Sequence, residues 1–143
     1  MDTEETNNTK SVSVHAVVVA GGSSSRMLGV DKMLVSVRGR PLLFYSIKAL
    51  NECHRVDTIA IVVSRRIKDD VRRLIRENGW SKVTEVIEGG VRRQDSVRKG
   101  LSSIGQATWV IVHDGARPCV GSRIFERGID AAQETGSSVA AVP

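Results

Sequence analysis

Short runs of consecutive apolar residues alternate along this chain with longer segments in which apolar residues recur every three or four positions. The continuous runs are rich in Val and Ile and predict buried strands at residues 14–20, 58–63, 83–87, 108–113 and 137–142. The longer period predicts helices at residues 41–51, 68–78, 95–104 and 122–135, the last begun by a Ser cap at Ser122. This alternation indicates an α/β fold, with a mostly parallel sheet and helices on both of its faces.

The two ends of the chain depart from this alternation. Residues 1–13 are polar and rich in Thr, Asn and Glu, so we expect a disordered tail there. At the other end, a strand at 137–142 without a following helix would leave the last sheet edge uncovered. We therefore expect residues 14–143 to form one domain that is truncated at its C-terminus.

The composition supports a single globular domain. The chain has 143 residues, of which 41% are hydrophobic and 26% are charged, and one core usually serves roughly 100–200 residues. No apolar run approaches the roughly 18 residues that a membrane span needs, and the acidic start lacks the features of a secretory signal. The two cysteines, Cys53 and Cys119, form no CxxC pair, which favours a reducing compartment. We expect a cytoplasmic protein with no membrane partner.

The net charge of +5 is concentrated in the middle of the chain. Residues 65–99 hold 11 Lys and Arg against 6 Asp and Glu, so the remaining residues are balanced. Basic segments can bind nucleic acid, but stacking on bases requires aromatic rings, which make up only 3% of the chain. We therefore expect no nucleic-acid partner, and we interpret the basic segment as a solvated helix face with some phosphate contacts.

A segment rich in Gly and Ser follows the first predicted strand. Residues 20–27 read AGGSSSRM, and Lys32 lies six positions after Arg26. Glycines allow the backbone to approach a ligand, and successive N–H groups can form an anion-binding concavity. Two cations beside such a loop suit a triphosphate, on which negative charge grows in the transition state. The segment has neither the Walker A nor the GxGxxG pattern, and an ordinary turn with a solvated lysine is the alternative.

A second motif, GGVRRQDSV at residues 89–97, joins a predicted strand to a predicted helix. Its paired glycines expose backbone groups, and the hydroxyl of Ser96 lies in the first turn of the helix. These groups could read the edge of a nucleobase. The alternative is a helix cap formed by Asp95, with solvated arginines in the loop.

A third motif, HDGARP at residues 113–118, follows the fourth predicted strand. An Asp at the carboxyl end of a strand can hold Mg²⁺, and Arg117 can bind a phosphate with two hydrogen bonds. The alternative is an internal Asp114–Arg117 ion pair in a turn that Pro118 ends. For His113 the simpler interpretation is a hydrogen-bonded histidine without a catalytic role.

Together the three motifs resemble the signature blocks of the 2-C-methyl-D-erythritol 4-phosphate cytidylyltransferases, enzymes of the non-mevalonate isoprenoid route. The resemblance runs from about Val14 to Pro143, and HDGARP is its most specific part. It implies a Rossmann-like nucleotidyltransferase fold, binding of CTP with Mg²⁺ or another divalent cation, and a homodimer when the enzyme is full length. The implied reaction transfers the cytidylyl group of CTP to 2-C-methyl-D-erythritol 4-phosphate, giving 4-diphosphocytidyl-2-C-methyl-D-erythritol and pyrophosphate.

The resemblance also implies roles for individual residues. Arg26 and Lys32 would be the catalytic cations that stabilise the transition state, and Asp114 would be the metal ligand. The residues that would bind the nucleotide are Ala20, Gly21, Gly22, Ser23, Ser24, Ser25, Gly89, Gly90, Arg93, Ser96, Ala116 and Arg117. Within this set, the backbone of Gly21 and Gly90 and the hydroxyl of Ser96 would read cytosine.

The chain departs from the family pattern at several positions. The common GxG of the first loop is GSS at residues 22–24, the usual Pro-Lys-Gln is DKM at residues 31–33, and the Ala of HDAARP is Gly115. The family's C-terminal part, which supplies a dimerisation arm and further contacts to the sugar phosphate, is absent from this sequence. The resemblance therefore implies that residues 14–143 are the nucleotide-binding part of the enzyme, and we expect this part to be inactive alone.

Three other functions share some of these features. The first motif also resembles that of the molybdenum-cofactor guanylyltransferases, which lack the other two motifs. Ribitol-5-phosphate cytidylyltransferases share all three motifs in altered form, so ribitol 5-phosphate is the alternative acceptor for the cytidylyl group. A noncatalytic nucleotide-binding fragment is the alternative of another class, against which the presence of Arg26, Lys32 and Asp114 together argues.

Overall fold

A four-stranded parallel sheet forms the centre of the protein. The computed structural model describes residues 11–22 and 29–142. The strands are β1 (Val14–Ala20), β4 (Thr58–Val63), β5 (Val83–Glu88) and β6 (Trp109–Asp114). Their order across the sheet is β5-β4-β1-β6, and all neighbouring pairs are parallel. The predicted parallel sheet is confirmed, and its parallel strands end at a common edge.

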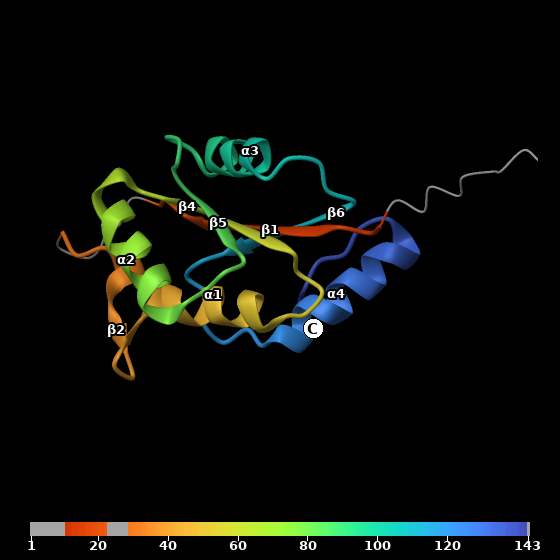
Figure 1. The fold of residues 1–143 in the computed structure, drawn as a ribbon, viewed down its shortest axis with the longest axis horizontal. Coiled ribbons are helices and arrows are strands. Elements are labelled where there is room, and N and C mark those ends of the chain that lie inside the picture. The colour runs from red at the N-terminus through yellow and green to blue at the C-terminus, as the bar shows by residue number, and fades with distance from the viewer. Residues whose placement is uncertain (1–10, 23–28, 143) are drawn as a thin grey trace, which may run out of the picture.

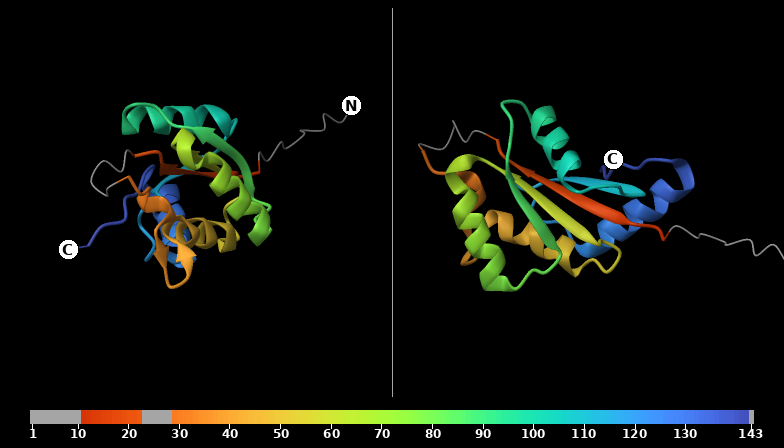
Figure 2. Two further views of the ribbon diagram at one scale, coloured as in Figure 1. Left: turned by 90° about the vertical axis from the view of Figure 1, so that its left-hand side faces the viewer. Right: turned by 45° about the horizontal axis from the view of Figure 1, so that its top comes forward.

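Helices cover both faces of this sheet. On one face lie α1 (Leu42–Glu52), α2 (Lys68–Asn78) and α4 (Ser122–Thr135), and on the other lies α3 (Arg93–Ser103) (Figure 1). Two further views in Figure 2 show the same layers. Successive residues of β1 point to opposite faces, so Val18 packs in the larger core with α1, whereas Val17 packs in a smaller core with α3. The predicted α/β fold with helices on both faces is confirmed.

Helix α3 lies very close to the sheet at Gly100. A Cβ atom at this position would lie 2.3 Å from Cγ1 of Val17 and 3.1 Å from Cγ2 of Val62. Both valines are fully buried, so neither has free space into which to move. A glycine is therefore required where the helix packs against the two central strands.

Between β1 and α1 the chain forms small elements that the hydrophobic pattern did not predict. A short 3₁₀ helix spans Lys32–Leu34, and the two-residue strands β2 (Ser36–Val37) and β3 (Arg40–Pro41) form a hairpin. Its turn has positive φ angles at Arg38 and Gly39, as a tight hairpin turn requires. A second 3₁₀ helix, Arg65–Ile67, precedes α2. Elements this short bury too few residues to leave a periodic pattern.

The predicted strand at residues 137–142 is wrong. These described residues have no regular secondary structure, and the side chains of Val139 and Val142 are each 90% exposed. Helix α4 ends at Gly136, whose φ of 89° is left-handed, and the hydroxyl of Ser138 then donates to the carbonyl of Gly128 within α4. The segment therefore turns back along the helix and does not join the sheet. The uncovered strand from which we argued truncation is not present.

The other predicted boundaries are close to those observed. The strand at 14–20 and the helix at 68–78 match to the residue, whereas α3 begins two residues before its predicted start at 95. A Ser cap at Ser122 is also wrong, because Gly121 is the N-cap of α4 and Ser122 is already helical. Of the tail predicted at 1–13, residues 1–10 lie outside the described part of the chain.

Candidate active site

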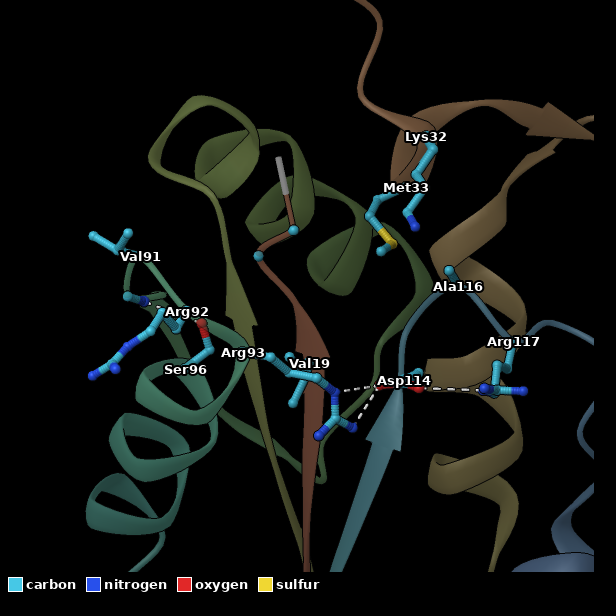
Figure 3. Close-up of a pocket in the computed structure, with 13 residues that line it drawn as sticks. Val19, Lys32, Met33, Val91, Arg92, Arg93, Ser96, Asp114, Ala116 and Arg117 are labelled. Atoms are coloured by element: carbon cyan, nitrogen blue, oxygen red, sulfur yellow. Dashed lines mark hydrogen bonds and ion pairs between the residues drawn. The ribbon is translucent and has the colours of Figure 1, made fainter. Parts of the chain in front are cut away.

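A cleft with a volume of about 450 Å³ opens where the strands reach their carboxyl ends. Its walls come from the end of β1, the 3₁₀ helix at Lys32–Leu34, the loop between β5 and α3, and the loop after β6 (Figure 3). Ligands of open α/β sheets bind at this edge. The three sequence motifs, which are far apart along the chain, thus meet at one cleft.

The loop between β5 and α3 is closed by a buried hydroxyl. Ser96 is only 2% exposed, and its Oγ accepts a hydrogen bond of 3.1 Å from the backbone N–H of Gly90. A Cβ atom at Gly90 would lie 2.4 Å from Cβ of Asp95, and one at Gly89 would lie 2.7 Å from Oγ of Ser96. The paired glycines therefore allow the loop to fold tightly over the first turn of α3. The hydroxyl hydrogen of Ser96 remains able to donate to a ligand.

Asp95 stabilises the start of α3. Its Oδ2 accepts a hydrogen bond of 3.1 Å from the backbone N–H of Arg92, and the guanidinium of Arg92 lies 3.2 Å from the same oxygen. The hydrogen bond from the side chain of Arg92 is the main reason that the pKa of Asp95 is below its ordinary value. The helix cap that we offered as an alternative for Asp95 is therefore present, next to the Ser96–Gly90 hydrogen bond.

Lys32 is placed beside the cleft by its neighbour Asp31. The buried carboxylate of Asp31 accepts from the backbone N–H of Met33 at 3.0 Å and from the hydroxyl of Ser64 at 3.3 Å. These bonds cap the 3₁₀ helix that contains Lys32 and join it to the end of β4. The Asp that replaces the family's usual proline thus holds the lysine in position.

At the end of β6, the carboxylate of Asp114 lies between two guanidinium groups. Nη2 and Nε of Arg93 lie 2.8 and 3.2 Å from Oδ1, and Nε of Arg117 lies 3.2 Å from Oδ2 (Figure 3). Partial burial opposes ionisation of Asp114, but the hydrogen bonds from Arg93 and Arg117 outweigh it and lower the pKa of the carboxyl. The internal Asp114–Arg117 pair offered as an alternative is present, together with a second pair to Arg93.

The loop after β6 is held on its other side by α1. The buried Ser46 on α1 has its Oγ 3.1 Å from the carbonyl of Gly115 and 3.2 Å from that of Arg117. His113 reaches the same hydroxyl with Nε2, at 3.3 Å. Because the hydroxyl hydrogen is directed at the carbonyls, Nε2 of His113 acts as the donor to Ser46. Burial lowers the pKa of His113, which favours the neutral ring, although the charge of Asp114 opposes this.

Most of the residues predicted to form the site line the cleft. Those that do are Gly21, Gly22, Lys32, Gly90, Arg93, Ser96, Asp114, Ala116 and Arg117. Two do not: Ala20 is fully buried in the core, and Gly89 packs against Ser96. Ser23, Ser24, Ser25 and Arg26 lie outside the described residues.

Some residues at the site were not predicted. Val19, Met33, Val91 and Arg92 also line the cleft, as expected for neighbours of the motif residues. Ser46 is far from every motif in the sequence, and an isolated serine in an amphipathic helix carries no functional signal. Asp31 was noted only as a departure from the family pattern, although a buried Asp before a short helix is a capping signal.

The charge of the cleft suits a polyanion. Among the described residues, its lining has four cationic side chains, Lys32, Arg92, Arg93 and Arg117, and one carboxylate, Asp114, with a formal charge of +3. The described residues contain no cluster of three or more His, Cys, Asp or Glu that could hold a metal ion. Mg²⁺ commonly uses one or two carboxylates and completes its shell with phosphate oxygens and water. Asp114 therefore fits a cation that binds together with a nucleotide, not one caged by the protein.

Comparison with known proteins shows the family of this chain. The sequence model of the 2-C-methyl-D-erythritol 4-phosphate cytidylyltransferase (IspD) family matches residues 14–143. The enzyme of that name from Dehalococcoides mccartyi (strain CBDB1) is 41% identical over 130 residues, which are 91% of this chain and 57% of the relative. The chain thus spans somewhat more than half the length of this relative.

Two solved structures show the same fold. The 4-diphosphocytidyl-2C-methyl-D-erythritol synthase from Anaerococcus prevotii DSM 20548 has a TM-score of 0.73 at 22% identity. The match covers 86% of this chain and 52% of the synthase chain. A Mycobacterium tuberculosis H37Rv protein in complex with manganese has a TM-score of 0.66 at 22% identity. This match covers 87% of this chain and 61% of the Mycobacterium tuberculosis chain. In the described residues, no helix is long and apolar enough to cross a membrane.

The family match includes the three motifs whose residues meet at the cleft, and it extends over the whole folded part of the chain. The parallel sheet with helices on both faces agrees with the fold of the structural neighbours. On this evidence, the chain belongs to the 2-C-methyl-D-erythritol 4-phosphate cytidylyltransferase family, with the fold of a Rossmann-like nucleotidyltransferase.

Proposed function

We propose that the protein containing this chain transfers the cytidylyl group of CTP to 2-C-methyl-D-erythritol 4-phosphate. In this reaction a phosphate oxygen of the sugar alcohol attacks the α-phosphorus of CTP. The bond between the α-phosphorus and the bridging oxygen to the β-phosphate breaks, and pyrophosphate leaves. The products are 4-diphosphocytidyl-2-C-methyl-D-erythritol and pyrophosphate. Family membership and the residues at the cleft both support this proposal.

The nucleotide phosphates would lie against the cationic part of the cleft. Lys32 and Arg117 lie on the right-hand side in Figure 3, across from Arg92 and Ser96. Gly21 and Gly22 bring bare backbone to the same cleft. Positive side chains attract the triphosphate and screen the repulsion between two anionic substrates. Lys32 would stabilise the charge that grows at the α-phosphate in the transition state. Arg26, to which the family resemblance assigns the same role, lies outside the described residues.

The base would be read at the loop between β5 and α3. Ser96 and Gly90 are already joined by a hydrogen bond, so this part of the loop is formed before a ligand arrives. A preformed site with fixed donors and acceptors discriminates between bases, because the wrong base leaves buried polar groups unpaired. The Ser96 hydroxyl and the backbone around Gly90 are the groups that we propose contact cytosine.

Asp114 would hold a divalent cation together with the nucleotide. Its carboxylate lies at the cleft, and its lowered pKa keeps it ionised at neutral pH, as a cation ligand must be. When bound, such a cation neutralises phosphate charge during the transfer. The manganese complex of a structural neighbour is a precedent for a divalent cation on this fold.

The reaction does not require a general base from the protein. A phosphomonoester carries about −1.5 to −2 charges at pH 7, so its oxygen is already a nucleophile. The position of His113 is consistent with this. The ring lies on the α1 side of β6, its Nε2 bonds Ser46, and burial lowers its pKa. The residues at the cleft therefore act by positioning and by electrostatic stabilisation.

The single observation that carries the proposal is that Lys32, Ser96 and Asp114 meet at one cleft in a chain of this family. The test is release of pyrophosphate by the protein expressed from its entire reading frame, with CTP, UTP or GTP and each of two acceptors. The acceptors are 2-C-methyl-D-erythritol 4-phosphate and ribitol 5-phosphate. We expect turnover with CTP and the first acceptor, and its loss in Asp114→Asn. Preference for GTP or for ribitol 5-phosphate would overturn the proposal.

The homodimer and the cytoplasmic location that we expect stay predictions. The same holds for the absence of a nucleic-acid partner, for which the low aromatic content is the supporting observation.

A further inference from the structure

The guanidinium of Arg93 occupies Oδ1, one of the two carboxylate oxygens of Asp114. Arg93 is the first residue of α3, and its side chain extends from the helix across Val19 to the end of β6 (Figure 3). Both Nη2 and Nε lie within hydrogen-bond distance of Oδ1, at 2.8 and 3.2 Å. Arg117 takes the other oxygen, Oδ2, from the opposite side. Both oxygens of the carboxylate are therefore in use before any ligand binds.

A divalent cation would compete with Arg93 for this carboxylate. Mg²⁺ binds carboxylate oxygens at about 2.0–2.1 Å, which would bring two positive charges next to the guanidinium of Arg93. The repulsion is strong because the Asp114 side chain is only 34% exposed, so water screens it incompletely. The carboxylate is also the one anionic side chain among the described residues that line the cleft. A cation arriving alone would meet a net positive site and a carboxylate that is already neutralised.

Arg93 is free to move away once an anion is present. Its side chain is 61% exposed, and within the part of the chain that the structure describes its polar contacts are those to Asp114. Phosphate oxygens bind guanidinium groups in the same two-bond geometry as carboxylates do. A nucleotide in the cleft would thus offer Arg93 a new partner and leave Oδ1 to the cation.

Resting on the proposed function, we propose that Arg93 is a positioning residue that makes cation binding at Asp114 depend on the nucleotide. In the ligand-free protein its guanidinium stands where the cation would bind. When a nucleotide–cation complex enters, Arg93 transfers to the phosphates and the cation takes Oδ1. Nucleotide and cation are then bound cooperatively, and the site does not take up a cation without a substrate.

The test measures binding of Mn²⁺ alone by electron paramagnetic resonance, using the protein expressed from its entire reading frame, without nucleotide. Arg93→Gln should bind Mn²⁺ about tenfold more tightly than the wild type, as expected when a charge-assisted hydrogen bond no longer competes. In Arg93→Gln/Asp114→Asn the gain should vanish. Arg92→Gln is the matched control, because Arg92 lines the same cleft and bonds Asp95 but not Asp114. It should change Mn²⁺ affinity much less.

A second measurement tests the cooperativity. CTP should raise the Mn²⁺ affinity of the wild type more than that of Arg93→Gln, because the variant has no guanidinium to displace. Equal Mn²⁺ affinity in wild type and Arg93→Gln, or undetectable binding in both, would overturn the proposal. An equal gain in Arg92→Gln would also overturn it, since the effect would then be general charge. None of these results depends on turnover, so a failure of the proposed reaction is recognised separately, by the pyrophosphate assay.

Discussion

The hydroxyl oxygen of Ser46 lies 3.3 Å from Nε2 of His113, on the α1 side of β6. The same hydroxyl bonds the carbonyls of Gly115 and Arg117, so one buried side chain holds three points of the loop that contains Asp114. The position of the carboxylate thus depends on α1, which is distant from every motif in the sequence.

Ser46→Ala should lower the free energy of unfolding by about 1–3 kcal/mol, because it leaves buried polar groups without a partner. The measurement is urea denaturation. Ser102→Ala is the matched control, since the exposed Ser102 hydroxyl bonds the carbonyl of Arg98 within its own helix. The control should change stability by no more than about 0.5 kcal/mol. Equal effects in the two variants would contradict the role given to Ser46.

His113 should make the protein less stable in mild acid. Because burial lowers its folded pKa below the ordinary value of 6.5, the unfolded chain binds the proton more readily. The free energy of unfolding therefore falls as the pH drops through about 6.5. The lowered pKa of Asp114 acts in a separate window below 3.8, where stability is lost as the pH falls through its folded pKa. We expect His113→Gln to lose less stability than the wild type between pH 8 and pH 5.5, and parallel curves would refute this.

Gly100→Ala should destabilise the protein by about 1–3 kcal/mol, because the added methyl group overlaps Val17 in a core without space. The control is Gly128→Ala in α4, where the new Cβ would lie at ordinary contact distance, 3.5 Å, from the hydroxyl of Ser138. That change should be neutral or stabilise the helix by up to about 1 kcal/mol. Thermal unfolding of both variants checks the prediction, and a Gly100→Ala protein as stable as the wild type would contradict the close packing of α3.

Ser96→Ala should narrow the preference for CTP over UTP. The substitution removes the acceptor of the Gly90 N–H and the hydroxyl that we propose contacts the base, so both pyrimidines would meet a less selective site. Competition between CTP and UTP for binding measures the ratio. An unchanged ratio would show that the base is read elsewhere.

The fold was largely predictable because its main signals are local. Buried parallel strands such as β1 and β4 require continuous β-branched runs, and α2 has a regular apolar period with Gly79 after it. The prediction of a strand at 137–142 is wrong because apolar residues form a strand only where a neighbouring strand is available for pairing. Ser138 instead bonds α4. A local sequence pattern cannot predict whether such a segment pairs with the sheet or packs on a helix.

The candidate site was predictable where its residues belong to motifs, and much less so in how they are connected. HDGARP identified Asp114, but its contact with Arg93, 21 residues earlier, depends on the order of the strands and the position of α3. Ser46 was not predicted at all, because a single serine acquires its role only through the tertiary packing of α1 against the end of β6.

The central claim is that this cleft catalyses cytidylyl transfer by stabilising charge at the α-phosphate. The most direct measurement compares kcat and the Kd for CTP in Lys32→Ala and Arg26→Ala, made in the protein expressed from its entire reading frame. Lys48→Ala, an exposed lysine on α1 that pairs with Glu52, is the control. We predict that kcat falls about 10²–10³-fold in both variants while the Kd for CTP changes far less, because the interaction strengthens in the transition state. Turnover near that of the wild type in both variants would contradict the account.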